Sequence, residues 1–427
     1  MALPKLKQDA TAARLVGLAL PQGSAWATAA RQEALARVAA MGLPTKRDEY
    51  WRYTDPASLI APQAPAAAVF ENTEQPPFDA IDRLRVVFVD GVFDAAASDP
   101  LEMAGLEIAR LADVTQLDVH WAKDLMGQLE TAGQSPVERP IAALNTAFAT
   151  DGIVIRATGK AAKPVNLIYL HRDENSDAQL HHLIKIEAGA DLTLLENGPA
   201  AARFSKVAEV DIADGGAFHH VRTQGRDHER RAFTACFARL GAESTFKSFT
   251  LTVNGALTRN ETVLTLTGDN AVAHVAGACV GDGAFHHDDT VFVTHDALSC
   301  ESRQVFKKVL RNGATGVFQG KILVKEGAQK TDGYQISQSL LLDEDSQFLA
   351  KPELEIYADD VACSHGSTSG AIDETALFYL RSRGVPHKQA TDLLTLAFLA
   401  EALDEIEDPA LAEDLQGRLE GWLARRR

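Results

Sequence analysis

Two side chains that bind soft metals lie two residues apart near the C-terminal end of the chain, in the stretch Cys363-Ser364-His365-Gly366. If residues 361–365 form a β-strand, alternation places Cys363 and His365 on one face. There a thiolate and an imidazole could serve a single soft metal ion or cluster. A packed cysteine beside a hydrogen-bonded structural histidine is the more common fate of such residues. The spacing alone therefore leaves both interpretations open.

A second group of candidate ligands lies earlier in the chain, at His286-His287-Asp288-Asp289 and at His295. Imidazole and carboxylate groups are common ligands of zinc and other transition metals. Neighbouring residues of a strand point to opposite faces, so at most alternate members could share one ion. We therefore expect turn or surface roles for most of these side chains, with metal binding by His286, His287 or His295 as the alternative.

The motifs of two common enzyme classes are incomplete or missing. Residues 316–322, GVFQGKI, resemble a phosphate-binding loop, but the glycine spacing is too short and Ile322 stands where Ser or Thr would hold magnesium. No Gly-x-Ser-x-Gly nucleophile elbow occurs in the sequence. We therefore expect neither nucleotide binding through a Walker motif nor nucleophilic catalysis.

The composition argues against several classes of partner. The 427 residues carry a formal net charge of -17, whereas binding to nucleic acid or to an anionic membrane needs basic patches. No apolar run approaches the roughly 18 residues of a membrane span, and no signal-peptide pattern is evident. The four cysteines form neither a CxxC pair nor a disulfide framework. We expect a soluble, reduced, cytoplasmic protein that binds no nucleic acid and no membrane.

The residue pattern predicts three regions. Residues 1–80 should hold N-terminal helices, one beginning after Ser24 and ending at Gly42, followed by a proline-rich linker. Residues 81–368 consist mainly of the short β-branched or aromatic runs that are typical of strands. Residues 369–427 return to a helical pattern. We therefore expect a mainly β core flanked by N-terminal and C-terminal α-helical regions.

Turns that contain glycine recur at intervals of roughly 26 residues in the strand-rich region, which is typical of a solenoid. We interpret the strands as coils of a parallel β-helix. Residues 331–340 alternate between a polar or small face and a mixed face, which predicts side-chain ladders between coils. Asn254-Gly255 and Asn312-Gly313 would also suit hairpins, so a β-sandwich is the alternative. The recurring turns are Gly189-Ala190, Gly216-Ala217, Gly241-Ala242 and Gly268-Asp269.

Short motifs spread over the chain form a set that is more specific than any one of them. They are GLPTKRDE at 42–49, VFQGKI at 317–322, AQKTD at 328–332, PELEI at 352–356, DDVACSHG at 359–366 and FYL at 378–380. Together they closely resemble the SufB/SufD family, the scaffold proteins of the SUF system of iron-sulfur cluster assembly. The resemblance is to the SufD branch, because Cys363-Ser364-His365-Gly366 stands where SufB sequences typically read Leu-Glu-His-Glu. Ser367 departs from the alanine that is usual in that branch.

The resemblance implies a right-handed parallel β-helix with flanking helices that acts as a non-catalytic scaffold subunit. It implies pairing with SufB and docking of the ATPase SufC on the C-terminal helical region, so that ATP hydrolysis belongs to SufC. A homodimer is the alternative state of the isolated chain.

For the site, the resemblance implies that His365 lies at the SufB-SufD interface and helps to hold a nascent iron-sulfur cluster. The cluster would be shared with SufB and transient, with no permanent cofactor in this chain. Cys363 is the second candidate ligand, because thiolate is the usual ligand of such clusters.

Two other functions compete with the scaffold hypothesis. A β-helical carbohydrate-active enzyme would need a secretion signal and a cleft of paired carboxylates, and neither is apparent in the sequence. A free-standing metal-binding protein that uses His286, His287 and His295 would hold stoichiometric metal when isolated.

Overall fold

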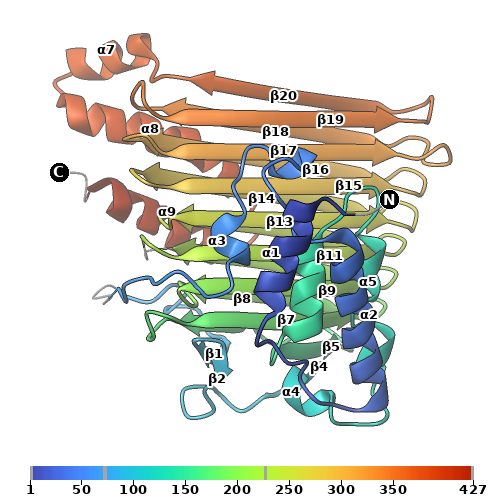
Figure 1. Cartoon of the computed structure of the whole chain (residues 1–427). Coiled ribbons are helices and arrows are strands. Elements are labelled where there is room, and N and C mark those ends of the chain that lie inside the picture. The colour runs from blue at the N-terminus through green and yellow to red at the C-terminus, as the bar shows by residue number, and fades with distance from the viewer. Residues whose placement is uncertain (1–2, 71–74, 226–227, 425–427) are drawn as a thin grey trace.

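The computed structural model describes residues 3–70, 75–225 and 228–424, and two ten-stranded sheets dominate it (Figure 1). Sheet A contains, in spatial order, β2 (Val92–Phe93), β1 (Leu84–Val89), β6 (Val165–Leu170), β8 (Asp191–Gly198), β10 (Ala217–Gly225), β12 (Thr245–Val253), β14 (Val272–Asp282), β16 (Glu301–Arg311), β18 (Asp332–Leu341) and β20 (Ala362–Gly370). Sheet B contains β3 (Glu102–Met103), β4 (Leu106–Arg110), β5 (Ile153–Ala157), β7 (Asp177–Ile186), β9 (Arg203–Ile212), β11 (Arg231–Leu240), β13 (Leu257–Leu266), β15 (His286–His295), β17 (Thr315–Val324) and β19 (Gln347–Ile356).

The helices lie at the two ends of the chain and in one segment before β5. The N-terminal helices are α1 (Lys5–Leu15), α2 (Ala25–Met41), the 3-10 helix η1 (Glu49–Trp51) and α3 (Ala57–Ile60). The segment before β5 contains α4 (Leu111–Val114), the 3-10 helix η2 (Trp121–Asp124), α5 (Gln128–Ala132) and α6 (Pro140–Phe148). The C-terminal helices are α7 (Glu374–Ser382), α8 (His387–Leu403) and α9 (Pro409–Ala424).

From β5 to β20 the chain alternates between the two sheets, and neighbouring strands within each sheet run parallel. This is the topology of a parallel β-solenoid, so the predicted mainly β fold with a β-helix core and terminal helices is confirmed. The β-sandwich alternative is wrong, because Asn254-Gly255 and Asn312-Gly313 connect one sheet to the other and form no hairpin. Among the described strands, antiparallel pairs occur only at the first coils, between β1 and β2, β3 and β4, and β4 and β5.

The corners between the sheets explain the repeat in the sequence. Paired residues lie 26 positions apart at Asp177 and Arg203, and 31 apart at Gln304 and Gln335. At each of six successive corners from sheet B to sheet A one residue has a left-handed backbone, which glycine adopts most readily. These residues are Gly189, Gly215, Glu243, Asn270, Ser299 and Lys330. The glycine signal therefore marks the early coils, while the later coils are longer and turn on other residues.

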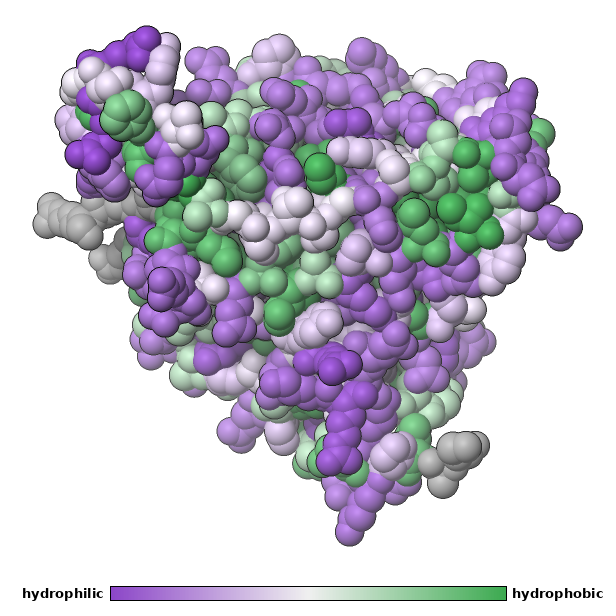
Figure 2. All heavy atoms as spheres, turned by 90° about the horizontal axis from the view of Figure 1, so that it is seen from above, coloured by the Kyte–Doolittle hydropathy of each residue, from purple (hydrophilic) through white to green (hydrophobic). Residues whose placement is uncertain are grey.

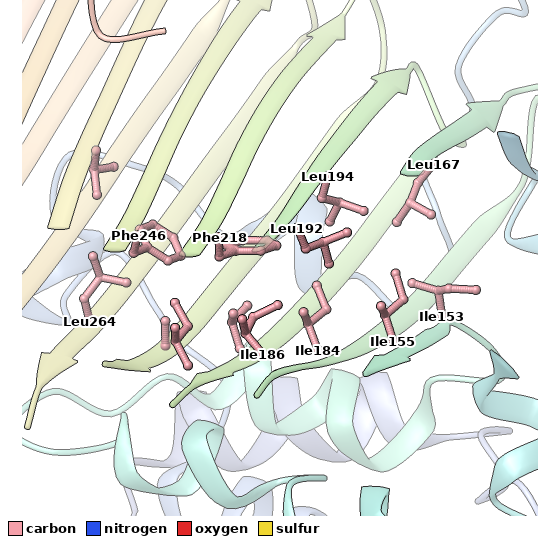
Figure 3. Packing of buried hydrophobic residues seen from close by; sticks show 14 of the residues in the cluster. Ile153, Ile155, Leu167, Ile184, Ile186, Leu192, Leu194, Phe218, Phe246 and Leu264 are labelled. Carbon is pink, nitrogen blue, oxygen red and sulfur yellow. The ribbon is translucent and has the colours of Figure 1, made fainter. Parts of the chain in front are cut away.

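The space between the two sheets, here called the lumen, is filled by alternate side chains of every strand. Figure 3 shows aliphatic and aromatic residues from both sheets meeting there, among them Leu192, Phe218 and Phe246. The Phe218 and Phe246 rings lie 5.6 Å apart between centroids, and both side chains are buried. Stacking of like residues in successive coils thus builds a continuous core.

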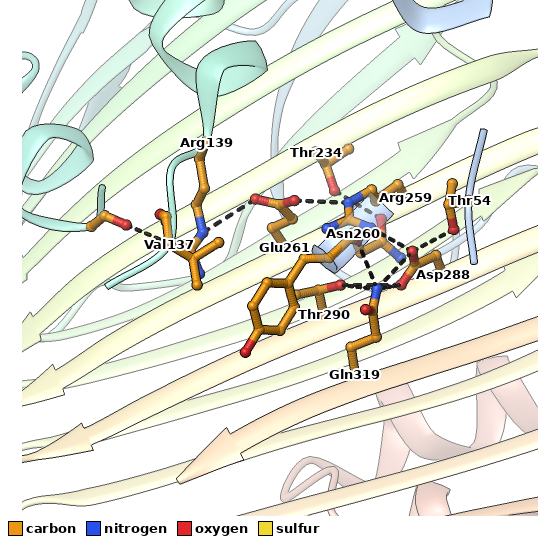
Figure 4. Close-up of polar contacts among 12 residues, drawn as sticks. Thr54, Val137, Arg139, Thr234, Arg259, Asn260, Glu261, Asp288, Thr290 and Gln319 are labelled. Carbon is orange, nitrogen blue, oxygen red and sulfur yellow. Dashed lines mark hydrogen bonds and ion pairs between the residues drawn. The ribbon is translucent and has the colours of Figure 1, made fainter. Parts of the chain in front are cut away.

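The N-terminal region packs against the outer face of sheet B through a buried polar network (Figure 4). Arg259 lies at its centre: Nε donates to Glu261 at 2.8 Å, Nη1 donates to the Tyr50 carbonyl oxygen at 2.8 Å, and the guanidinium lies 4.0 Å from the Trp51 ring centre. Thr54 donates to Asp288 at 2.5 Å. These contacts fix the segment after α2 across β13 and β15.

The C-terminal region packs against the outer face of sheet A, chiefly through α8 over β14 and β16. Its acidic residues pair with basic residues of the sheet: Glu401 with Lys307, Glu405 with Arg303, and Glu407 with Lys247. Asp373 begins α7 by accepting the backbone N–H groups of two residues of the first turn. Charge pairing and apolar packing together hold these helices on one flank of the solenoid.

We predict that Phe246→Ala lowers the free energy of unfolding by about 3–5 kcal/mol, because the side chain is fully buried and its removal leaves a cavity. Urea denaturation followed by circular dichroism would measure the change. Phe378→Ala, at a phenylalanine that is 73% exposed, is the matched control and should change the value by less than about 0.5 kcal/mol. Equal losses in the two variants would contradict this account of the core.

Candidate functional site

The solenoid ends in a coil that is paired on one side only. Within the described residues β20 pairs only with β18 in sheet A, and β19 pairs only with β17 in sheet B. We call this coil, β19 with β20, the open end. It lies at the top of Figure 1, and Figure 2 looks down onto it. In that view, patches of hydrophobic residues are exposed at the surface among hydrophilic residues. The outer edges of these two strands carry backbone groups that no described strand pairs with, and such edges can pair with another chain.

The side chains of β20 continue the columns of the strand beneath it. Gln335 of β18 pairs in register with His365 of β20. Two residues further on, the Ser337 and Ser367 hydroxyl oxygens lie 2.9 Å apart. The Ser339 hydroxyl group donates to Ser369 at 3.1 Å. The ladders predicted for residues 331–340 are therefore present. Because Gln335 and Ser337 are fully buried in the lumen, His365 lies on the same lumen-facing side of the open end.

The side chain of His365 is exposed and unpaired among the described residues, as a ligand for an external group must be. Its side chain is exposed, since no coil lies above it. It makes no hydrogen bond or ion pair with any residue in the described ranges 3–70, 75–225 and 228–424. The imidazole therefore has both ring nitrogens available.

Cys363 shares that face but is packed more tightly. It pairs with Gly333, and a Cβ atom at Gly333 would lie only 3.2 Å from the Cys363 sulfur, so the thiol occupies the space that this glycine leaves. It packs with Ile322 and its neighbours, is half-buried, and burial raises the pKa of the Cys363 thiol. Cys363 and His365 are thus brought to one face, as alternation predicts, while only the imidazole is exposed.

The three earlier histidines lie in β15 and have separate surroundings. The expected turn or surface roles are wrong for most of this group, because His287, Asp288, Asp289 and His295 are buried in a strand. His286 faces outward, with Nε2 2.9 Å from the Thr54 hydroxyl oxygen. His287 faces the lumen, where Nδ1 is 2.9 Å from Lys308 Nζ, and His295 lies 2.8 Å from the Ser302 hydroxyl oxygen. Burial lowers the pKa of His287 to about 3 and that of His295 to about 4, so both are neutral at pH 7. No cluster of three or more His, Cys, Asp or Glu side chains suited to a metal occurs among the residues that the structure describes.

The lumen also holds charged groups that sequence reasoning did not single out. Lys308 donates to Asp289 at 2.6 Å, and Lys206 is paired with Glu196. Burial alone would lower the pKa of Lys308, but Asp289, Cys279 and Asp288 together raise it by more, and the pKa of Asp289 is lowered, so both partners of the ion pair stay charged. The members of each pair come from different strands that meet inside the coil, and a linear pattern of residues does not indicate such a meeting. Each of these charged groups is paired with another side chain inside the lumen, so we assign them a structural role.

The fold is a parallel β-solenoid with flanking helices, and its last coil carries an exposed imidazole beside a packed thiol. These features define a β-solenoid protein with a candidate ligand site at its open end. Two family models match this chain. The model described as the SufBD core domain of SUF system FeS cluster assembly matches residues 169–398, and that of the SufBD protein N-terminal region matches residues 21–165. The chain belongs to the SufB/SufD family.

Individual relatives point to the SufD branch. The chain is 29% identical over 403 residues to the iron-sulfur cluster assembly protein SufD of Escherichia coli, a match that covers 91% of each chain. It is 28% identical to an iron-sulfur cluster assembly SufBD family protein of Synechocystis, over 91% of this chain and 88% of that one. It is 26% identical to the SufD protein of Bacillus subtilis, over 66% of this chain and 67% of the relative. The resemblance to SufD found in the motifs is thereby confirmed. Among the described residues no helix is long and apolar enough to cross a membrane.

We predict that Cys363 is the first of the four cysteines to be alkylated by iodoacetamide in the native chain, and that it reacts more slowly than a free cysteine. The thiolate is the reacting form, and the raised pKa means that the rate should still be rising above pH 9. Burial raises the pKa of Cys236 and Cys279 to about 12, so these two should stay unmodified and serve as internal controls. Mass spectrometry over a pH series gives the rates. Modification of Cys363 at the speed of a free thiol would show that it is not packed as described.

Proposed function

We propose that this chain is the SufD-type scaffold subunit of an iron-sulfur cluster assembly complex. It would act without catalytic chemistry of its own, in the cytoplasm, and would hold no permanent cofactor. The observation that carries the proposal is the open end of the solenoid, where a coil that is paired on one side only presents the exposed His365. The names of the relatives, which are iron-sulfur cluster assembly proteins, support it.

The partner at the open end would be a SufB-type subunit. Strand edges recognise other strands by backbone hydrogen bonds, and a second solenoid with its own open end would satisfy the free groups of β19 and β20. The same edges would allow a homodimer of the isolated chain, so the two states compete for one surface.

His365 would then contribute one ligand to a nascent cluster held between the two subunits. A neutral imidazole binds iron and exchanges more readily than a thiolate, which suits a site that must release its product. Cys363 ranks second, because its thiol is packed on Gly333 and its pKa is raised.

The ATPase of the complex, a SufC-type subunit, would dock on the C-terminal helical region. Phe378 and Tyr379 of α7 are 73% and 55% exposed, and Leu393 of α8 is 45% exposed. Exposed aromatic residues on a helix are typical anchors of protein interfaces. ATP binding and hydrolysis would belong to that subunit.

We predict that His365→Ala lowers the iron and sulfide content of the assembled complex several-fold, while the complex still forms. Loss of one exposed side chain costs the solenoid little stability, since surface substitutions change the free energy of unfolding by about 0.5 kcal/mol or less. The test is co-expression with SufB-type and SufC-type partners, anaerobic purification and chemical assay of iron and acid-labile sulfide.

The matched control is Ser364→Ala, which changes the neighbouring residue on the opposite, outward face of β20. Its complex should carry wild-type amounts of iron. Equal cluster content in all three complexes would contradict a ligand role for His365. Failure of the wild-type chain to form a complex would contradict the scaffold proposal itself.

We predict that the double substitution Phe378→Ala and Tyr379→Ala weakens binding of the purified ATPase subunit by at least about tenfold, because interface aromatics commonly contribute 2 kcal/mol or more. Isothermal titration calorimetry would measure the affinity. Val119→Ala, at a residue that is 81% exposed in the segment before β5, is the control and should leave binding unchanged. Unchanged affinity in the double variant would exclude α7 as the docking helix.

A further inference from the structure

The amide of Gln335 forms the floor of the lumen directly beneath the open end. Gln335 is fully buried, and its side chain reaches across to the opposite sheet, where a Cβ atom at Gly320 would lie 2.3 Å from its Nε2. Only glycine at position 320 leaves room for the amide. The next residue above it in the same column is His365.

Gln335 is hydrogen-bonded to the coil below it and not to the coil above it, while Gln304 Nε2 in the coil below also has no partner. Gln335 Nε2 donates to the side-chain oxygen of Gln304, one coil further down, at 2.9 Å. Gln335 Oε1 is buried and accepts no hydrogen bond. The two polar atoms of a primary amide diverge from its carbon, so when Nε2 is directed at Gln304 the oxygen points in a different direction and is left without a donor. A buried acceptor without a donor thus lies one coil below an imidazole without a partner.

We infer that Gln335 is a positioning residue for His365: a rotation of the exposed imidazole lets Gln335 Oε1 accept the N–H of one ring nitrogen. The other nitrogen then keeps its lone pair for a metal outside the lumen. Histidines that bind metals commonly donate their second N–H to a carbonyl or carboxylate, which fixes the tautomer and orients the ring. The functional meaning of this inference rests on the proposed role of His365 as a cluster ligand. The hydrogen bond itself can be tested independently of that role.

The first test is nitrogen NMR of the unaltered chain, labelled with 15N in its histidine rings, at pH 8 where a free imidazole is neutral. His365→Ala identifies the signals of His365. We expect one predominant tautomer in the wild type. A mixture of tautomers like that of free histidine would overturn the inference, and this result needs no substitution at Gln335.

Variants then separate positioning from simple packing. Gln335→Met keeps the length of the side chain but removes the acceptor, and it should return His365 to a mixture of tautomers. Gln335→Glu keeps an acceptor oxygen and should preserve the wild-type tautomer. Gln304→Met, one coil lower, removes one amide of the stacked pair but leaves Gln335 Oε1 in place. This variant should also preserve the wild-type tautomer of His365. If Gln335→Met and Gln304→Met change the tautomer ratio of His365 equally, the two amides serve only to stack the coils and Gln335 is not a positioning residue.

Iron content tests the functional consequence separately. In the anaerobically purified complex, Gln335→Met should weaken retention of iron by about 10–100-fold, the usual cost of losing the partner of a ligating histidine, while Gln304→Met should not. If His365→Ala leaves iron unchanged, the proposed ligand role of His365 fails, whereas the tautomer measurement still decides whether Gln335 holds His365.

Discussion

Parallel, in-register stacking of coils is the constraint on which the rest of this structure depends. Each strand uses its backbone groups to pair with the strand one coil below and one coil above, and each lumen side chain rests on its counterpart in the next coil. A coil is therefore complete only when it has neighbours on both sides. The last coil, β19 with β20, has one neighbour in the described chain, so its outer strand edges stay unpaired and His365 has no hydrogen-bond partner among the described residues.

The same constraint explains how the lumen tolerates charge. A buried ion must find its partner within the coil or in the adjacent one, and Lys308 with Asp289 and Lys206 with Glu196 do so. Cys236 and Cys279 face this closed interior, where burial keeps them protonated. Chemistry with an external group is thus excluded along most of the lumen and becomes available where the stacking ends.

Part of this arrangement can be predicted from the sequence, and the reasons for the limit are physical. Glycine turns such as Gly189 mark the early corners, but Glu243 and Asn270 adopt the same left-handed backbone later, so the repeat fades. Alternation correctly brings Cys363 and His365 to one face, because a period of two depends only on a strand being present. Whether each is packed or exposed depends on Gly333 beneath the thiol and on the absence of a coil above, and neither follows from local spacing.

Other features are set by contacts between distant segments. The helix α6 is buried along its whole length, so it has no exposed polar face of the kind that marks a surface helix. The pairing of Tyr50 with Glu353, which ties the segment after α2 to the last coil, joins residues 303 positions apart. The orphan oxygen of Gln335 likewise appears only once Gly320, on the opposite sheet, is seen to lie against the amide.

The most direct test of this account is hydrogen-deuterium exchange of the β20 backbone, with and without a SufB-type partner. Outward-directed amide groups of β20 should exchange quickly in the monomeric chain, and they should become protected when the partner binds, because a second edge then pairs with them. Amide groups of β14, which has a strand on each side, should be protected in both states. Binding of the partner without added protection in β20 would contradict the claim that the open end is the assembly surface.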